Sequence, residues 1–81
     1  MKPFRVPIRS QKALGDALSR LRVQQGLTQD ELADALGISR RYIYAIESGR
    51  PNLYASRLFE VLRELGARID IIAETDEEQR R

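Results

Sequence analysis

Apolar residues recur with a helical period in four stretches of the chain, and a glycine ends each of them. Ser10 is a good N-cap for the first stretch, which ends at Gly26. Its apolar positions are Ala13, Leu14, Ala17, Leu18 and Leu21. This spacing predicts an amphipathic helix with one face turned toward the core.

Two short helices are predicted next, with a glycine turn between them. Thr28-Gln29-Asp30-Glu31 matches a capping box, in which the hydroxyl and the carboxylate each satisfy a free amide of the first turn. Gly37 permits the left-handed turn that ends this helix, and Ser39 caps the following one. The residues expected to face inward are Leu32, Ala33, Leu36, Ile38, Ile43 and Ile46.

A fourth helix begins near Leu53 or Tyr54, after the break at Gly49-Arg50-Pro51. Its apolar residues recur at i, i+3, i+4 and i+7 before Gly66, and we expect this face to close the core. They are Leu58, Val61, Leu62 and Leu65. The predicted fold class is therefore all-α, with four to five helices.

The segment Arg68-Ile69-Asp70-Ile71-Ile72 partly alternates and is rich in β-branched residues, which predicts a short strand. A lone strand leaves its backbone unpaired, so its partner is either the same strand of a second subunit or Phe4–Ile8, which also alternates. Pro7 restricts Phe4–Ile8 to an edge strand or an extended arm. In either case we expect the C-terminal strand to lie in a homodimer interface; the plain alternative is an unpaired tail. The predicted interface residues are Ile69, Ile71 and Ile72.

Composition narrows the classes of function. The 81 residues are enough for one domain, and the absence of cysteine and histidine excludes disulfides and thiolate metal sites and removes the commonest general base. We therefore expect no enzyme activity, metal or cofactor. No apolar run is long enough to cross a bilayer and no leader precedes the domain, so we expect a cytoplasmic protein without a membrane partner.

Charge is unevenly distributed along the chain, although the net charge is only +2. Lys2, Arg5, Arg9 and Lys12 precede the first acid, Asp16, whereas acids crowd the last eight residues. The body without that tail is basic, which is typical of a nucleic-acid partner through phosphate neutralisation, although a solvated mixed-charge surface fits the charge equally well. We divide the chain into a basic arm or edge strand (1–9), a helical domain (10–66), a dimerisation strand (67–73) and a flexible charged tail (74–81).

The second and third helices, joined by a glycine turn, meet the physical requirements of a helix-turn-helix motif. In this motif the second helix enters the major groove of DNA by its N-terminal end. Arginine binds guanine through two parallel hydrogen bonds, and tyrosine or alanine contacts a thymine methyl. The predicted base-reading residues are Ser39, Arg40, Arg41, Tyr44 and Ala45. A solvated helix face, with the arginines paired to acids such as Glu47, is the plain alternative for Arg40 and Arg41.

The segment LTQDELADALGISRRYIYAIESGR resembles the Xre/Cro-type helix-turn-helix family, which implies a lambda-repressor-like fold. The resemblance covers about Leu14 to Leu65. Free amides at the N-terminus of the second helix suit a phosphate, so Thr28 and Gln29 are predicted backbone contacts. The resemblance implies that Gln29 also braces the recognition helix, and that Arg50 and Tyr42 contact phosphates. Plainer roles are a cap for Thr28, a cover over Ile38 for Tyr42 and a turn closure near Arg50 for Glu47.

The segment PNLYASRLFEVLRELGARIDI resembles the end of HipB-like antitoxins. This resemblance implies a homodimeric repressor of its own operon, which binds an inverted-repeat operator in double-stranded DNA and a HipA-type serine/threonine kinase toxin. Two alternatives stay open: a stand-alone Xre-type regulator without a toxin, and a protein-interaction module that has kept the fold but lost DNA binding.

Overall fold

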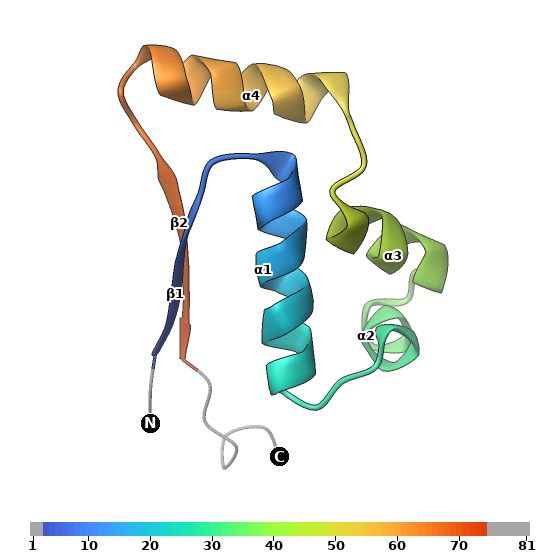
Figure 1. Cartoon of the computed structure of the whole chain (residues 1–81). Coiled ribbons are helices and arrows are strands. Elements are labelled where there is room, and N and C mark those ends of the chain that lie inside the picture. Colours follow the sequence, from blue (N-terminus) through green and yellow to red (C-terminus); the bar gives the residue numbers. More distant parts are fainter. Residues whose placement is uncertain (1–2, 75–81) are drawn as a thin grey trace.

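The computed structural model describes residues 3–74, which form four helices and two strands. Strand β1 (Pro3–Ile8) leads into α1 (Gln11–Gln24), the short helices α2 (Gln29–Leu36) and α3 (Arg40–Ser48), then α4 (Leu53–Glu64) and strand β2 (Ile69–Glu74). Helix α1 stands between the sheet on one side and α2 and α3 on the other, and α4 crosses one end (Figure 1). No helix of the described part is long and apolar enough to span a membrane.

The partner of β2 is β1 of the same chain. The two strands are antiparallel, with Phe4 opposite Ala73, Val6 opposite Ile71 and Ile8 opposite Ile69. Of the two partners left open for the C-terminal strand, the N-terminal segment is therefore the one found, because it supplies the backbone groups that the strand needs. The domain is mostly helical with a two-stranded sheet, and not all-α. Of the predicted tail, Glu74 ends β2, and residues 75–81 lie outside the described part.

The core lies between the sheet and α1. Phe4, Ile8, Ala17 and Phe59 form its buried cluster, and Ile8 is 1% exposed. Ile69 and Ile71 point to the same side and pack against this cluster, whereas Ile72 is 61% exposed on the opposite face of β2. Alternation along a strand explains this division, since only every second side chain can face α1.

The predicted capping box is confirmed. The Thr28 hydroxyl accepts from the Glu31 amide at 3.0 Å, and the Glu31 carboxylate accepts from the Thr28 amide at 2.9 Å. Gly37 ends α2 at a φ of 69°, the left-handed turn predicted for it. These local bonds set where α2 begins and how sharply the chain turns into α3.

Several residues predicted to face inward are exposed. Helix α4 turns Phe59 and Leu62 toward the core, and leaves Leu58, Val61 and Leu65 42, 52 and 74% exposed. Ile46 and Leu36 are likewise 51 and 60% exposed. The prediction that the Leu58–Leu65 face closes the core was therefore right for Leu62 and wrong for the other three residues, because α4 turns its Phe59–Leu62 side to the core and β1 and β2 supply the rest of the cover.

Gly15 lets α1 and α3 approach closely. A Cβ atom at Gly15 would lie 2.5 Å from the carbonyl oxygen of Glu47 and 2.6 Å from that of Ile46. Both atoms belong to the α3 backbone, which cannot swing aside as a side chain can. The position of α3 therefore depends on the absence of a side chain at Gly15.

We predict that Gly15→Ala destabilises the fold by about 1–3 kcal/mol, the usual cost of overpacking. The sign is diagnostic, since alanine in a helix interior is ordinarily better than glycine by about 1 kcal/mol. Thermal unfolding followed by circular dichroism measures the change, with Gln24→Ala at the exposed end of α1 as the control. A Gly15→Ala protein as stable as the wild type would contradict the close contact.

Candidate nucleic-acid interface

Helix α3 presents the predicted base-reading residues on its outer side. Helices α1 and α2 hold it from behind, and Ile43 is buried at 3% exposure. Ser39, Arg40, Arg41 and Tyr44 are exposed, and Ala45 is half-buried beside the α3–α4 connection. The Ser39 side chain makes no capping hydrogen bond, so its hydroxyl is available to an external group. The residues thus gather at the N-terminal end of an anchored helix.

A charged pair anchors α3 to α1. Arg22 donates from Nε to Glu47 Oε2 at 2.6 Å and from Nη2 to Glu47 Oε1 at 3.0 Å, a two-pronged bond. The third arm of the guanidinium donates to the Leu27 carbonyl at 2.6 Å. The Arg22 and Glu47 side chains are 12 and 8% exposed, which makes this pair far less solvated than the other ion pairs of the described part.

The pair shifts the ionisation of both partners toward the charged forms. The hydrogen bond to Glu47 raises the pKa of Arg22, and the hydrogen bond from Arg22 lowers the pKa of Glu47 despite the opposing effect of burial. Glu47 therefore keeps its charge to a lower pH in the folded chain than in the unfolded chain. The pair stabilises the fold fully above the unfolded pKa, and this stability is lost as the pH falls through the folded pKa.

Gln29 joins this network from α2. Its amide donates from Nε2 to Glu47 Oε1 at 3.0 Å, so one carboxylate holds α1, α2 and α3 together. Glu47 does not close the turn near Arg50, nor does it pair with Arg40 or Arg41, because both its oxygens are engaged by Arg22 and Gln29. Gln29 is half-buried while Thr28 beside it is exposed at the α2 N-terminus.

Gln11 positions the backbone around Arg50. Its side chain donates to the Arg50 carbonyl at 3.0 Å and accepts from the Asn52 amide at 3.3 Å and the Ser56 hydroxyl at 3.1 Å. The Arg50 side chain itself is exposed, as is Tyr42 at 64%. Both predicted phosphate contacts therefore lie on the surface: Tyr42 within α3, next to the buried Ile43, and Arg50 just after the end of α3.

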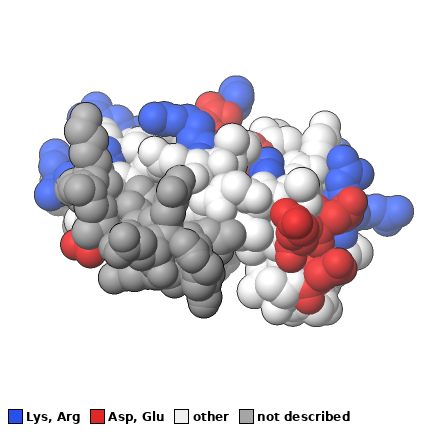
Figure 2. All heavy atoms as spheres, turned by 90° about the horizontal axis from the view of Figure 1, so that it is seen from below, with Lys and Arg blue, Asp and Glu red and all other residues white. Residues whose placement is uncertain are grey.

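The arginines of α3 are weakly paired. Arg40 Nε lies 3.9 Å from Asp30 Oδ1 with both side chains largely exposed, and Arg41 has no ion pair with an acid of the described part. Exposed pairs of this kind contribute little, so they cost little to exchange for a phosphate or a base. Acidic side chains gather instead at the right of the view from below, where α2 lies, with basic ones at the edge beside them (Figure 2). Asp30 and Glu31 lie in the first turn of α2 beside Thr28 and Gln29, so phosphate repulsion disfavours only the part of this face around Asp34 as a DNA contact.

Arg22, Gln11 and Gly15 were missed by the sequence prediction. A signal for the charged pair does exist in the sequence: Arg22 follows Leu18 by four residues and Glu47 follows Ile43 by four. Each charge therefore continues an apolar helix face, where only a paired charge is tolerated. Which opposite charge is the partner depends on the folded arrangement of α1 and α3.

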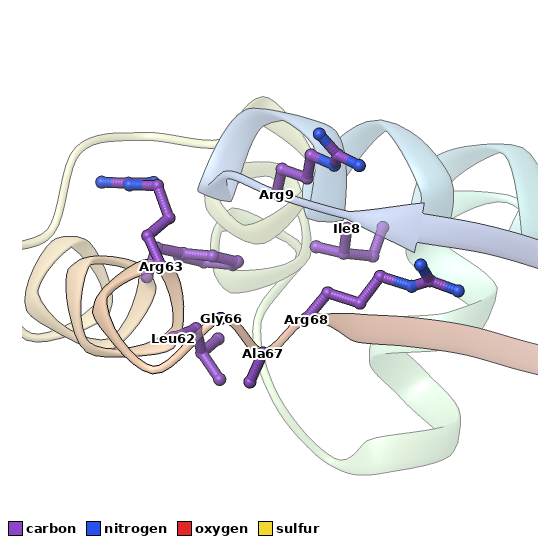
Figure 3. A pocket seen from close by; sticks show the side chains of 8 residues that line it. Ile8, Arg9, Leu62, Arg63, Gly66, Ala67 and Arg68 are labelled. Carbon is purple, nitrogen blue, oxygen red and sulfur yellow. The ribbon is translucent and has the colours of Figure 1, made fainter.

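A second basic cluster surrounds a recess of about 540 Å³ where α4, the end of β1 and the start of β2 meet. Arg9, Arg63 and Arg68 lie around it; Arg9 and Arg68 extend to one side and Arg63 to the other, so the three guanidinium groups do not meet at a common point (Figure 3). Arg68 also donates to Asp70 at 3.0 Å. This arrangement does not form a convergent site. Among residues 3–74 no three potential ligands of the His, Cys, Asp or Glu type gather as a metal site.

The capped helix, glycine turn and anchored outward-facing helix define a helix-turn-helix protein. A model of the family described as "Helix-turn-helix" matches residues 18–72. The chain belongs to this helix-turn-helix family.

Two relatives come from Sinorhizobium fredii strain NBRC 101917 / NGR234. The uncharacterized HTH-type transcriptional regulator y4mF is 36% identical over 66 residues, which cover 82% of this chain and 87% of that protein. The uncharacterized HTH-type transcriptional regulator y4dJ is 36% identical over 67 residues, with the same coverage of each chain. No solved structure matches the chain significantly.

We predict that Glu47→Ala destabilises the fold by about 2–3 kcal/mol, somewhat less than the loss of a fully buried pair, because it leaves the partly buried Arg22 charge without its partner. Glu60→Ala is the control, since Glu60 pairs with Arg57 at an exposed site worth at most about 1 kcal/mol. Chemical denaturation measures both changes, and equal losses would contradict the anchoring role.

The pH dependence gives a separate check on the same pair. Wild-type stability should decline as the pH falls below about 4.3, the usual glutamate value, while Glu47→Gln should lack this part of the decline. Denaturation midpoints measured from neutral to acidic pH provide the comparison. Parallel curves for the two proteins would show that Glu47 has an ordinary pKa in the folded chain.

Proposed function

We propose that this protein is a sequence-specific DNA-binding repressor of transcription that acts as a homodimer. The observation that carries the proposal is the placement of exposed, weakly paired Arg40 and Arg41 on a helix anchored by the buried Arg22–Glu47 pair. Positive charge at this position serves no packing purpose, and a rigidly held helix places it reproducibly against base edges.

The DNA-binding geometry follows from the motif. The N-terminal end of α3 enters the major groove, with Ser39, Arg40, Arg41, Tyr44 and Ala45 toward the bases. Thr28, Gln29, Tyr42 and Arg50 then contact the phosphates on either side. Both relatives are named as transcriptional regulators of the HTH type, which supports the same role here.

A homodimer places two such helices in successive major grooves of an inverted repeat, about 34 Å apart. The proposal that β2 takes part in the dimer is narrowed by its pairing with β1, which uses one edge of the strand. The other edge of β2 and the exposed side chain of Ile72 remain accessible to a second subunit. Ile69 and Ile71, also predicted in the interface, pack against the core of their own chain and would hold β2 in place beneath it.

The finer proposal is a HipB-like antitoxin that represses its own operon and binds a HipA-type kinase toxin. It rests on the resemblance of residues 51–71 to the end of such antitoxins. Co-purification with the product of a neighbouring kinase-like gene tests it. A neighbouring region without such a gene favours a stand-alone cytoplasmic regulator instead.

Selection of bound duplexes from a random pool at about 0.15 M salt tests the DNA-binding function itself, because nonspecific phosphate binding is weak there. The proposal predicts enrichment of an inverted repeat. Absence of enrichment with a folded protein would indicate a protein-interaction module on the same fold.

We predict that Arg40→Ala or Arg41→Ala costs about 1–3 kcal/mol of affinity at the selected operator and relaxes sequence preference there, whereas Arg50→Ala weakens binding to all duplexes similarly. Titration of each variant against operator and scrambled duplex measures the difference. Arg20→Ala, on α1 with its guanidinium over Phe4 of β1, is the matched control. If all three arginine variants lost affinity equally on both duplexes, the division into base and phosphate contacts would be wrong.

A further inference from the structure

Helix α4 carries an apolar stripe that its own chain leaves exposed. Tyr54, Leu58, Val61 and Leu65 are 82, 42, 52 and 74% exposed. Their spacing of four, three and four residues places them on one line along the helix. Phe59 and Leu62 face the core instead, so α4 has two apolar faces, of which the chain covers one. Single exposed apolar residues are normal, but a continuous line of four marks an interaction surface.

We infer that this stripe packs against the same stripe of a second copy, with the two α4 helices antiparallel about a two-fold axis. The inference rests on the proposed function, because an inverted repeat requires two copies related in this way. Reversing α4 about a point between Phe59 and Glu60 exchanges Tyr54 with Leu65 and Leu58 with Val61. The stripe therefore meets itself in register, which is the condition for a two-fold interface.

Charge along the stripe favours the antiparallel arrangement. Arg57 and Glu64 are seven residues apart, on the same flank of the stripe, and both are exposed. Corresponding flanks of two antiparallel helices face each other, so Arg57 lies beside Glu64 of the partner subunit at both ends of the interface. A parallel pair would place Arg57 beside the opposite flank of the partner, away from the partner's Glu64, and would lose this attraction. The nearby Glu60, 2.8 Å from Arg57, holds that guanidinium on the same flank.

Analytical ultracentrifugation of the full chain without DNA tests the interface. We expect wild type to sediment at twice its 9.3 kDa chain mass. Val61→Glu would bury two carboxylates at the centre of the stripe and should weaken dimerisation by about a hundredfold or more. Val23→Glu is the matched control on α1, where the wild-type side chain is 61% exposed, and it should leave the dimer intact. A wild-type monomer, a Val61→Glu dimer, or dimer loss with Val23→Glu alone would each overturn the inference.

A second test exchanges two charges, so that the result does not depend on whether the Val61→Glu protein folds. Arg57→Glu alone should weaken dimerisation by about tenfold, and Arg57→Glu with Glu64→Arg should restore it, because the exchanged pair regains its attraction. Circular dichroism of each variant checks that α4 stays folded. Failure of the double variant to recover the dimer would exclude the antiparallel pairing.

Failure of the interface and failure of the proposed function are distinguishable. If the protein passes these dimer tests but enriches no duplex, the α4 interface is supported and the repressor function is rejected. A protein that enriches an inverted repeat while Val61→Glu still dimerises keeps the repressor and rejects the α4 interface.

Discussion

The buried carboxylate of Glu47 is the point on which the arrangement of the helices depends. It accepts two hydrogen bonds from Arg22 of α1 and one from Gln29 of α2, while its own backbone belongs to α3. A charge so little exposed is tolerated only when it is paired. Helices α1, α2 and α3 are therefore held in one geometry by a single carboxylate and the donors that surround it.

Close packing makes this geometry rigid. Gly15 removes the side chain that would separate α1 from the α3 backbone, and Gln11 fixes the connection that follows α3. Because α3 is held in place by these contacts, its exposed side chains are positioned without further contacts to the rest of the protein. This is why the exposed arginines of α3 can remain weakly paired and available for a negatively charged partner.

Features set by short-range bonds were predictable from the sequence, as the Thr28–Glu31 capping box and the Gly37 turn show. Features that join distant segments were predicted only in part. The sequence offered Phe4–Ile8 as one of two partners for the C-terminal strand and indicated no partner for Arg22, because both choices depend on which surfaces meet after folding. Periodicity likewise indicated that Leu58, Val61 and Leu65 are apolar positions of a helix, but it does not distinguish a face covered by its own chain from an unpartnered one.

Two basic surfaces compete for a polyanion in this molecule, the outer side of α3 and the recess rimmed by Arg9, Arg63 and Arg68. Amide chemical-shift mapping during titration with a selected duplex distinguishes them directly. The account predicts the largest changes from Ser39 to Ala45 and at Thr28 and Gln29, with little change at Arg9, Arg63 and Arg68. Changes centred on the recess, with α3 unaffected, would contradict the assignment of α3 as the DNA-binding helix.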